Sequence, residues 1–112
     1  MKIIYSKYFP FKPYKAITLL KWIVVREDVK EYFTAEDYNH ECIHYAQEKE
    51  LLYIGFYILY IIEFLITLLY CFNWHNAYRR ISFEREAYKN QSNLNYLQHR
   101  KRFAWKKLII KR

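Results

Sequence analysis

The sequence is poor in glycine, proline and cysteine. Its 112 residues include one glycine, two prolines and two cysteines. A single glycine leaves little scope for long loops or for the glycine-rich turns that cradle nucleotide phosphates. Cys42 and Cys71 are too far apart for a CxxC pair. We therefore expect both thiols to be reduced, as in a cytoplasmic or cytoplasmic-side protein rather than a disulfide-framed secreted one.

Acidic residues are missing from the C-terminal end, which is strongly basic. Residues 99–112 contain seven Lys or Arg and no Asp or Glu, in a chain of net charge +8. Such a tail could contact anionic lipid or nucleic acid, although a solvated basic helix end is the commoner case. Only Phe103 and Trp105 interleave aromatic with basic residues here, so we expect no nucleic-acid partner and leave membrane contact open.

Apolar and aromatic residues are abundant. The hydrophobic fraction is 54% and the aromatic fraction 21%, which excludes intrinsic disorder. The length suits one domain, residues 1–112, with a single core. Residues 1–15, with Pro10 and Pro13, lack the apolar run of a signal or transit peptide and are predicted to form an extended lead-in.

The expected fold is mainly α, of the α+β class, with about four helices after a short N-terminal strand or hairpin. Residues 16–26 are rich in β-branched residues and predict the strand or hairpin, with a turn at 20–22. Thr34, with Asp37 three residues later, predicts a capped helix start. The helices are expected at residues 34–54, 51–72, 77–90 and 93–110, with Gly55 at the bend between the first two and Ser92 capping the last.

Residues 51–72 form a long apolar run whose single charged residue is Glu63. The run is long enough to span a membrane. Its polar-tipped side chains nevertheless recur every three or four residues, which places them on one helical face: Tyr53, Tyr57, Tyr60, Glu63, Thr67 and Tyr70. We expect either a membrane-embedded helix whose tyrosine face meets the protein, or a buried or dimerising helix that would make the protein a homo-oligomer.

The most specific pattern is His40-Glu41-Cys42-Ile43-His44, an HExxH sequence inside the predicted helix 34–54. Residues four apart share a helix face, so His40 and His44 can bind one metal ion, while Glu41 brings a carboxylate to a water on that ion. Chance would produce the motif about 0.01 times in a chain of this composition. The pattern indicates a zinc hydrolase. Gln47 shares the face and could bond to a ligand or a substrate amide, or simply lie at the helix rim.

A catalytic zinc site needs three protein ligands and a fourth position open to water, so one ligand must come from later in the chain. The segment 82–88, SFEREAY, favours Glu84, because the small side chain of Ala87 would let this helix approach the first one closely. Glu86 is the rival, about 200° around the helix from Glu84, so the two cannot face one ion. The other candidates are Glu63, His75 and His99.

HExxH, an apolar helical segment and E-x-x-A on a later helix together resemble the gluzincin metallopeptidases, especially the membrane-embedded CAAX-processing and heat-shock peptidases. The chain is also similar to small bacterial proteins that combine HExIHxxQ with FExEAY. The likeness covers roughly residues 38–90. It implies a minimal zincin-like domain in which His40, His44 and Glu84 bind Zn²⁺, Glu41 is the general base, and the strand before the helix offers its edge to an extended substrate.

The chain departs from this pattern after Ala87. Those peptidases often carry Asp at the next position, where this chain has Tyr88. Tyr88 lies four residues after Glu84 and shares its helix face, so its hydroxyl could orient a ligand, stabilise an oxyanion or only pack. The catalytic candidates are therefore Glu41 and Tyr88. The additional helices and domains of the larger peptidases are also missing, which weakens the expectation of selective proteolysis.

Two functions follow from these patterns. The first is a zinc-dependent metallopeptidase acting on a peptide or protein substrate, either associated with the cytoplasmic side of a membrane through residues 51–72 and the basic tail, or cytoplasmic. The second is a non-catalytic, zinc-stabilised helical interaction module whose fourth coordination position is closed by His75 or Glu63. Two histidines and a carboxylate also suit Fe(II) or Mn(II), although HExxH on a helix favours zinc.

Overall fold

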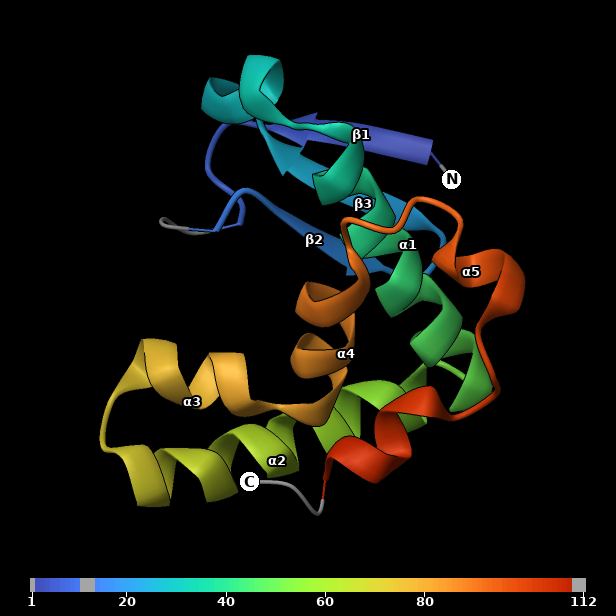
Figure 1. Cartoon of the computed structure of the whole chain (residues 1–112). Helices are drawn as coiled ribbons and strands as arrows, with labels where there is room; N and C mark the ends of the chain where they lie inside the picture. Colours follow the sequence, from blue (N-terminus) through green and yellow to red (C-terminus); the bar gives the residue numbers. More distant parts are fainter. Residues whose placement is uncertain (1, 11–13, 110–112) are drawn as a thin grey trace.

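The computed structural model describes residues 2–10 and 14–109. Pro13, the predicted helix end at Ile110, and the last two basic residues of the tail, Lys111 and Arg112, lie outside the described residues. The described chain forms a small three-stranded sheet at its N-terminal end and is otherwise mainly helical (Figure 1), which confirms the α+β prediction.

The sheet contains β1 (Lys2–Ser6), β2 (Ala16–Leu19) and β3 (Trp22–Arg26), in the order β1-β3-β2. β2 and β3 are antiparallel and form the predicted hairpin, with Leu20 at φ 54° in its turn. Residues 2–6 are extended, as predicted, but they also form a strand, because β1 pairs in parallel with β3, and this pairing was not predicted. This short strand is mostly exposed and has no clear alternation of apolar and polar residues, so the sequence carries little signal for it.

A 3₁₀ helix, η1 (Glu27–Tyr32), leads into α1 (Ala35–Glu50). The predicted cap is present: Thr34 Oγ1 accepts from the Asp37 N–H at 3.1 Å, and Asp37 Oδ2 accepts from the Thr34 N–H at 2.9 Å. The helix ends before the predicted boundary, because Leu52 and Tyr53 adopt φ values of 55° and 64°. The bend therefore lies just before Gly55, which belongs to the first turn of the next helix.

The apolar run forms α2 (Ile54–Cys71), as predicted. Most of its polar-tipped face meets the protein, since Glu63 and Thr67 are buried, whereas Tyr70 near the end of the helix is exposed. Glu63 accepts hydrogen bonds from the Ser82 N–H at 3.0 Å and from Ser82 Oγ at 2.6 Å. Among the described residues, α2 is the one helix long and apolar enough to cross a membrane by length and composition, and 17% of it is buried.

The remaining predicted helices are interrupted. Instead of one helix over 77–90, the chain forms α3 (Trp74–Arg80) and α4 (Ser82–Asn90), separated by Ile81 in an extended conformation. The last predicted helix is replaced by α5 (Tyr96–His99) and a 3₁₀ helix, η2 (Ala104–Leu108). Both breaks coincide with long-range contacts, since Glu63 bonds the first residue of α4 and Arg100 bonds Glu50 and Glu86.

The core lies where α4 meets its neighbours. Phe83 and Ile81 pack with Phe56 of α2 and Trp105 of η2. On the other side of α4, Ala87 is fully buried, and α4 lies against α1 (Figure 1). β2 also contacts α1. The first helix is thus held between the sheet and α4, and Cys42 on it is a free thiol, as is Cys71 on α2.

Candidate metal centre

Three buried side chains converge between α1 and α4. His40 Nε2 and His44 Nε2 are 3.1 Å apart, and each lies 3.1 Å from Glu84 Oε1. The centre of this triangle is about 1.8 Å from each atom, slightly less than the usual zinc–nitrogen and zinc–oxygen distances of about 2.0–2.2 Å. The group formed by His40, His44 and Glu84 could therefore hold a metal ion.

The outer nitrogen of each imidazole has an amide partner. His40 Nδ1 is 2.8 Å from Gln91 Oε1, and His44 Nδ1 is 2.8 Å from Gln47 Oε1. An amide oxygen only accepts hydrogen bonds, so each Nδ1 carries a hydrogen, and in its neutral form each imidazole keeps a lone pair on Nε2. Two such nitrogens and a carboxylate oxygen in mutual contact repel one another unless a cation lies between them. The donor set thus fits a metal ion, and Gln47 has the supporting role considered from sequence.

The electrostatics of the same group favour a bound cation. Burial opposes the ionisation of Glu84, but the two imidazoles outweigh it and hold the pKa of this carboxyl well below its usual range. Burial lowers the pKa of His44, yet the charge and hydrogen bond of Glu84 raise it further than burial lowers it. A negative Glu84 therefore attracts positive charge to this point, whether a proton or a metal ion.

Tyr60 completes the surroundings of Glu84. Its hydroxyl donates to Glu84 Oε2 at 2.6 Å, which leaves Oε1 facing the imidazoles. Burial, together with the charge of Glu84, raises the pKa of Tyr60, so the phenol stays protonated and remains a donor. Sequence reasoning missed this contact, although it had placed Tyr60 on the polar face of the apolar run.

Glu41 lies beside the three candidate ligands and accepts a hydrogen bond from the sheet. Thr18 Oγ1, on β2, donates to Glu41 Oε1 at 2.8 Å and lies 3.0 Å from the Glu41 backbone oxygen. Burial raises the pKa of Glu41, while the neighbouring imidazoles of His44 and His40 lower it, and the net shift is upward. Glu41 is therefore a stronger base than an ordinary surface carboxylate. The role of Thr18 was not predicted from sequence.

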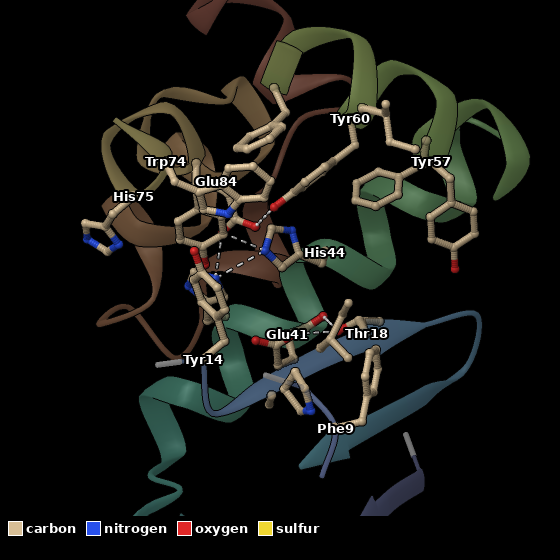
Figure 2. A pocket seen from close by; sticks show the side chains of 18 residues that line it. Phe9, Tyr14, Thr18, Glu41, His44, Tyr57, Tyr60, Trp74, His75 and Glu84 are labelled. Carbon is tan, nitrogen blue, oxygen red and sulfur yellow. Dashed lines mark hydrogen bonds and ion pairs between the residues drawn. The ribbon is translucent and has the colours of Figure 1, made fainter. Parts of the chain in front are cut away.

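A pocket of about 570 Å³ opens next to these groups (Figure 2). Glu41 and the three candidate ligands line it, together with mainly aromatic and aliphatic side chains from β2, α2 and α3. Ala16, Ile17 and Thr18 form one wall, so the outer strand of the sheet borders the pocket.

Tyr88 supports the site from outside the pocket. Its ring meets His40 edge-on, with centroids 4.5 Å apart, and the Arg79 guanidinium stacks on it at 3.8 Å. The Tyr88 hydroxyl lies 3.0 Å from that of Tyr78. Among the described residues, Tyr78 lines the pocket and Tyr88 does not. The structure therefore places the Tyr88 ring against the imidazole of His40, one of the candidate ligands.

The other candidate ligands have different partners. Glu86 accepts from Arg100 Nε at 2.5 Å and from the Tyr96 hydroxyl at 2.6 Å. It also accepts from Gln47 Nε2 at 2.9 Å, so it braces the amide that orients His44. Glu63 is bonded to Ser82, His75 is exposed at the pocket rim, and His99 is exposed on α5.

No protein-family model, curated protein or solved structure matches the chain. The class of site, two histidines and a glutamate beside a second glutamate, is therefore defined by the geometry alone.

Proposed function

We propose that the protein is a zinc-dependent metallopeptidase of the gluzincin type. The observation that carries this proposal is the juxtaposition of a buried His40–His44–Glu84 group with Glu41 at the wall of an open pocket. A metal ion that only stabilised the fold would need neither the Glu41 carboxylate beside it nor an open pocket. We propose zinc because both histidines come from an HExxH sequence on a helix.

In this mechanism His40, His44 and Glu84 hold the ion. When bound, zinc supplies a Lewis acid that makes water more acidic and polarises a peptide carbonyl. Glu41 takes a proton from the attacking water as the new carbon–oxygen bond forms, then returns it to the amine nitrogen as the carbon–nitrogen bond breaks. Thr18 keeps the Glu41 carboxylate in position through its hydroxyl. Tyr60 fixes the orientation of Glu84.

The pocket suggests which peptides would suit this site. Phe56, Tyr57, Tyr60 and Phe64 of α2 form an aromatic wall opposite β2. Apolar side chains of a substrate would lose contact with water there, while its backbone could pair with the edge of β2. We therefore propose an extended peptide with large apolar residues next to the cleaved bond.

The alternative, a zinc-stabilised interaction module, requires a fourth protein ligand. The two side chains that could supply it are engaged or distant from the triangle: Glu63 bonds Ser82, and His75 is exposed at the rim. This arrangement favours the catalytic proposal, because among the described residues only His40, His44 and Glu84 are placed to hold an ion together.

The first test is the metal content of protein purified without added metal. We expect about one zinc per chain, lost in Glu84→Gln and retained in Glu63→Gln. The second variant is the matched control, since Glu63 is also a buried, hydrogen-bonded glutamate but lies outside the triangle. Both variants are checked for folding by circular dichroism. Well-folded native protein without metal, or equal loss in both variants, would overturn the proposed site.

The second test separates metal binding from catalysis. Glu41→Gln keeps a carbonyl oxygen that Thr18 can bond but removes the base. We expect normal zinc content and a fall in turnover of at least about 100-fold, measured by mass spectrometry on a mixture of unstructured peptides rich in Phe, Leu and Tyr. Loss of zinc from this variant, or unchanged hydrolysis, would contradict the role assigned to Glu41.

A further inference from the structure

α2 presents its apolar face outward. The residues of this face are Ile54, Ile58, Ile61, Leu65 and Leu69, continued by Phe72 just after the helix, and they are 54–87% exposed. An ordinary surface helix buries such a stripe and exposes its polar side. Here the polar side is inward, where Glu63 bonds Ser82 and Tyr60 bonds Glu84. We call these six residues the α2 face. A continuous apolar patch of this kind marks a contact site.

Exposed negative charge is confined to the other end of the molecule. All eleven acidic residues belong to the part of the chain that the structure describes, and four of them are exposed: Glu27, Asp28, Glu31 and Glu36. These four lie on η1 and at the start of α1, at the top of Figure 1, whereas α2 lies at the bottom. The other carboxylates are buried or half-buried within the fold.

Exposed basic residues lie on the two elements that pack beside α2, as they also do on and around the sheet and η1, where the exposed lysines include Lys2, Lys7, Lys15 and Lys30. η2 packs beside the first half of α2 through Trp105 and carries the exposed Lys106 and Lys107. α3 packs along the second half of α2 and ends with the exposed Arg80. The elements beside the apolar stripe therefore carry exposed basic residues and, like the rest of residues 37–109, no exposed carboxylate. This charge pattern matches an anionic surface with an apolar interior.

We propose that the α2 face docks on an anionic lipid bilayer, with α2 lying in the plane of the interface. Insertion across the bilayer would expose the Glu63 and Tyr60 side to lipid and break its bonds to α4, so the helix enters the surface on one side only. Tyr70 and Trp74, both exposed near the end of the stripe, have the amphipathic rings that favour the headgroup region. Lys106, Lys107 and Arg80 contact the phosphates.

A second copy of the chain fits this face less well. Pairing two α2 faces would cover the apolar stripe, but it would also bring the basic flanks of both copies together without exposed carboxylates to compensate. An anionic bilayer removes the same apolar surface from water and supplies the opposite charge. The charge pattern therefore selects the bilayer over the dimer.

The test is flotation of the full chain with vesicles of phosphatidylcholine alone and with 30% phosphatidylglycerol. We expect binding to the anionic vesicles, weaker binding to the neutral ones, and a decrease as salt is raised. The double variant Ile58→Asp/Leu65→Asp should bind at least about tenfold less. The control Leu94→Asp/Leu97→Asp changes the net charge equally, at exposed leucines outside the α2 face, and should retain most of the binding.

Several results would overturn the proposal. One is equal binding of neutral and anionic vesicles. Another is an equal loss of binding in the two double variants, which would mean that net charge alone governs the contact. A third is a stable dimer in analytical ultracentrifugation that is abolished by Ile58→Asp/Leu65→Asp, with no vesicle binding by the native chain, which would assign the α2 face to a second copy. Because both pairs of substituted residues are exposed and outside the pocket lining, circular dichroism should show an unchanged fold.

Discussion

Glu48, one turn after His44, is a fully buried carboxyl group. Its Oε1 accepts from the Leu20 N–H at 3.0 Å and from the Tyr57 hydroxyl at 2.9 Å. Its Oε2 has no hydrogen-bond partner among the described residues. Burial raises the pKa of Glu48 to about 7, against the smaller opposing effect of the Tyr57 hydrogen bond. This group is therefore partly protonated near neutral pH.

This shift predicts a pH dependence of stability. A carboxyl whose pKa is raised by folding stabilises the folded state fully below its unfolded pKa, about 4.3, and this contribution is lost as the pH rises through its folded pKa. The free energy of unfolding should therefore fall between about pH 5 and 7. Glu48→Gln should flatten this decline and add about 1–2 kcal/mol at pH 8, measured by urea unfolding at pH 5, 6, 7 and 8. The same decline in native and variant proteins would contradict this prediction.

At the residue scale, the sequence predicted the three candidate ligands but few of the residues that form hydrogen bonds with the site. His40, His44 and Glu84 converge as expected, because helical spacing fixes the two histidines and SFEREAY marked the glutamate. Thr18 and Gln91 were not predicted, since they reach Glu41 and His40 from distant parts of the chain. Such contacts depend on how the elements pack, which local patterns do not encode.

At the scale of elements, helix starts were easier to predict than breaks. The Thr34 cap is local, because its partner Asp37 lies three residues away. The break after α1 is also local in structure, but no glycine or proline occupies it: Leu52 and Tyr53 adopt positive φ values, and the Ile54 N–H donates to the Leu52 carbonyl at 2.7 Å. The breaks at Ile81 and Arg100 coincide with long-range bonds to carboxylates. Four continuous helices were therefore predicted where the chain is interrupted.

The α1–α2 break predicts a stabilising substitution. Leu52 has φ 55° and is 80% exposed, so its side chain strains the backbone and contributes little packing. Glycine adopts this conformation without the clash of a Cβ atom. Leu52→Gly should raise the free energy of unfolding by about 0.5–1 kcal/mol, measured by chemical denaturation. Leu59→Gly, at a helical position in α2, should instead destabilise the protein; a loss of stability in both variants would contradict the strain assigned to Leu52.

At the scale of the molecule, the candidate metal centre joins α1 to α4. Its ligands are separated by 40 residues between His44 and Glu84, so an unfolded chain has no preformed site. An ion that binds only the folded chain stabilises it by about 2.7 kcal/mol at 100 times its dissociation constant. Removal of the ion with a chelator should then lower Tm by about 10 °C, as measured by calorimetry. Glu84→Gln should show no such change; an equal shift in that variant would place the ion elsewhere.

The orientation of α2 in the molecule was predicted only in part. The periodicity of the sequence predicted the polar face of this helix, but not what would cover its apolar face. The spacing of Tyr57, Tyr60 and Glu63 defined the polar face, and these residues do meet the protein. The spacing did not predict whether another element would cover the aliphatic stripe. In the structure α3, α4 and η2 all pack away from this stripe, which stays exposed. Long-range packing, rather than the helix itself, decides which face stays in water.

The uneven placement of the exposed carboxylates has a consequence for how the molecule approaches a charged surface. The four exposed acids lie on η1 and at the start of α1, where the exposed Lys30 and the Lys15–Asp37 ion pair offset part of the negative charge. Residues 37–109 expose basic side chains but no carboxylate. Within a Debye length of about 8 Å at physiological ionic strength, an anionic surface therefore repels the η1 carboxylates and meets no such repulsion at α2.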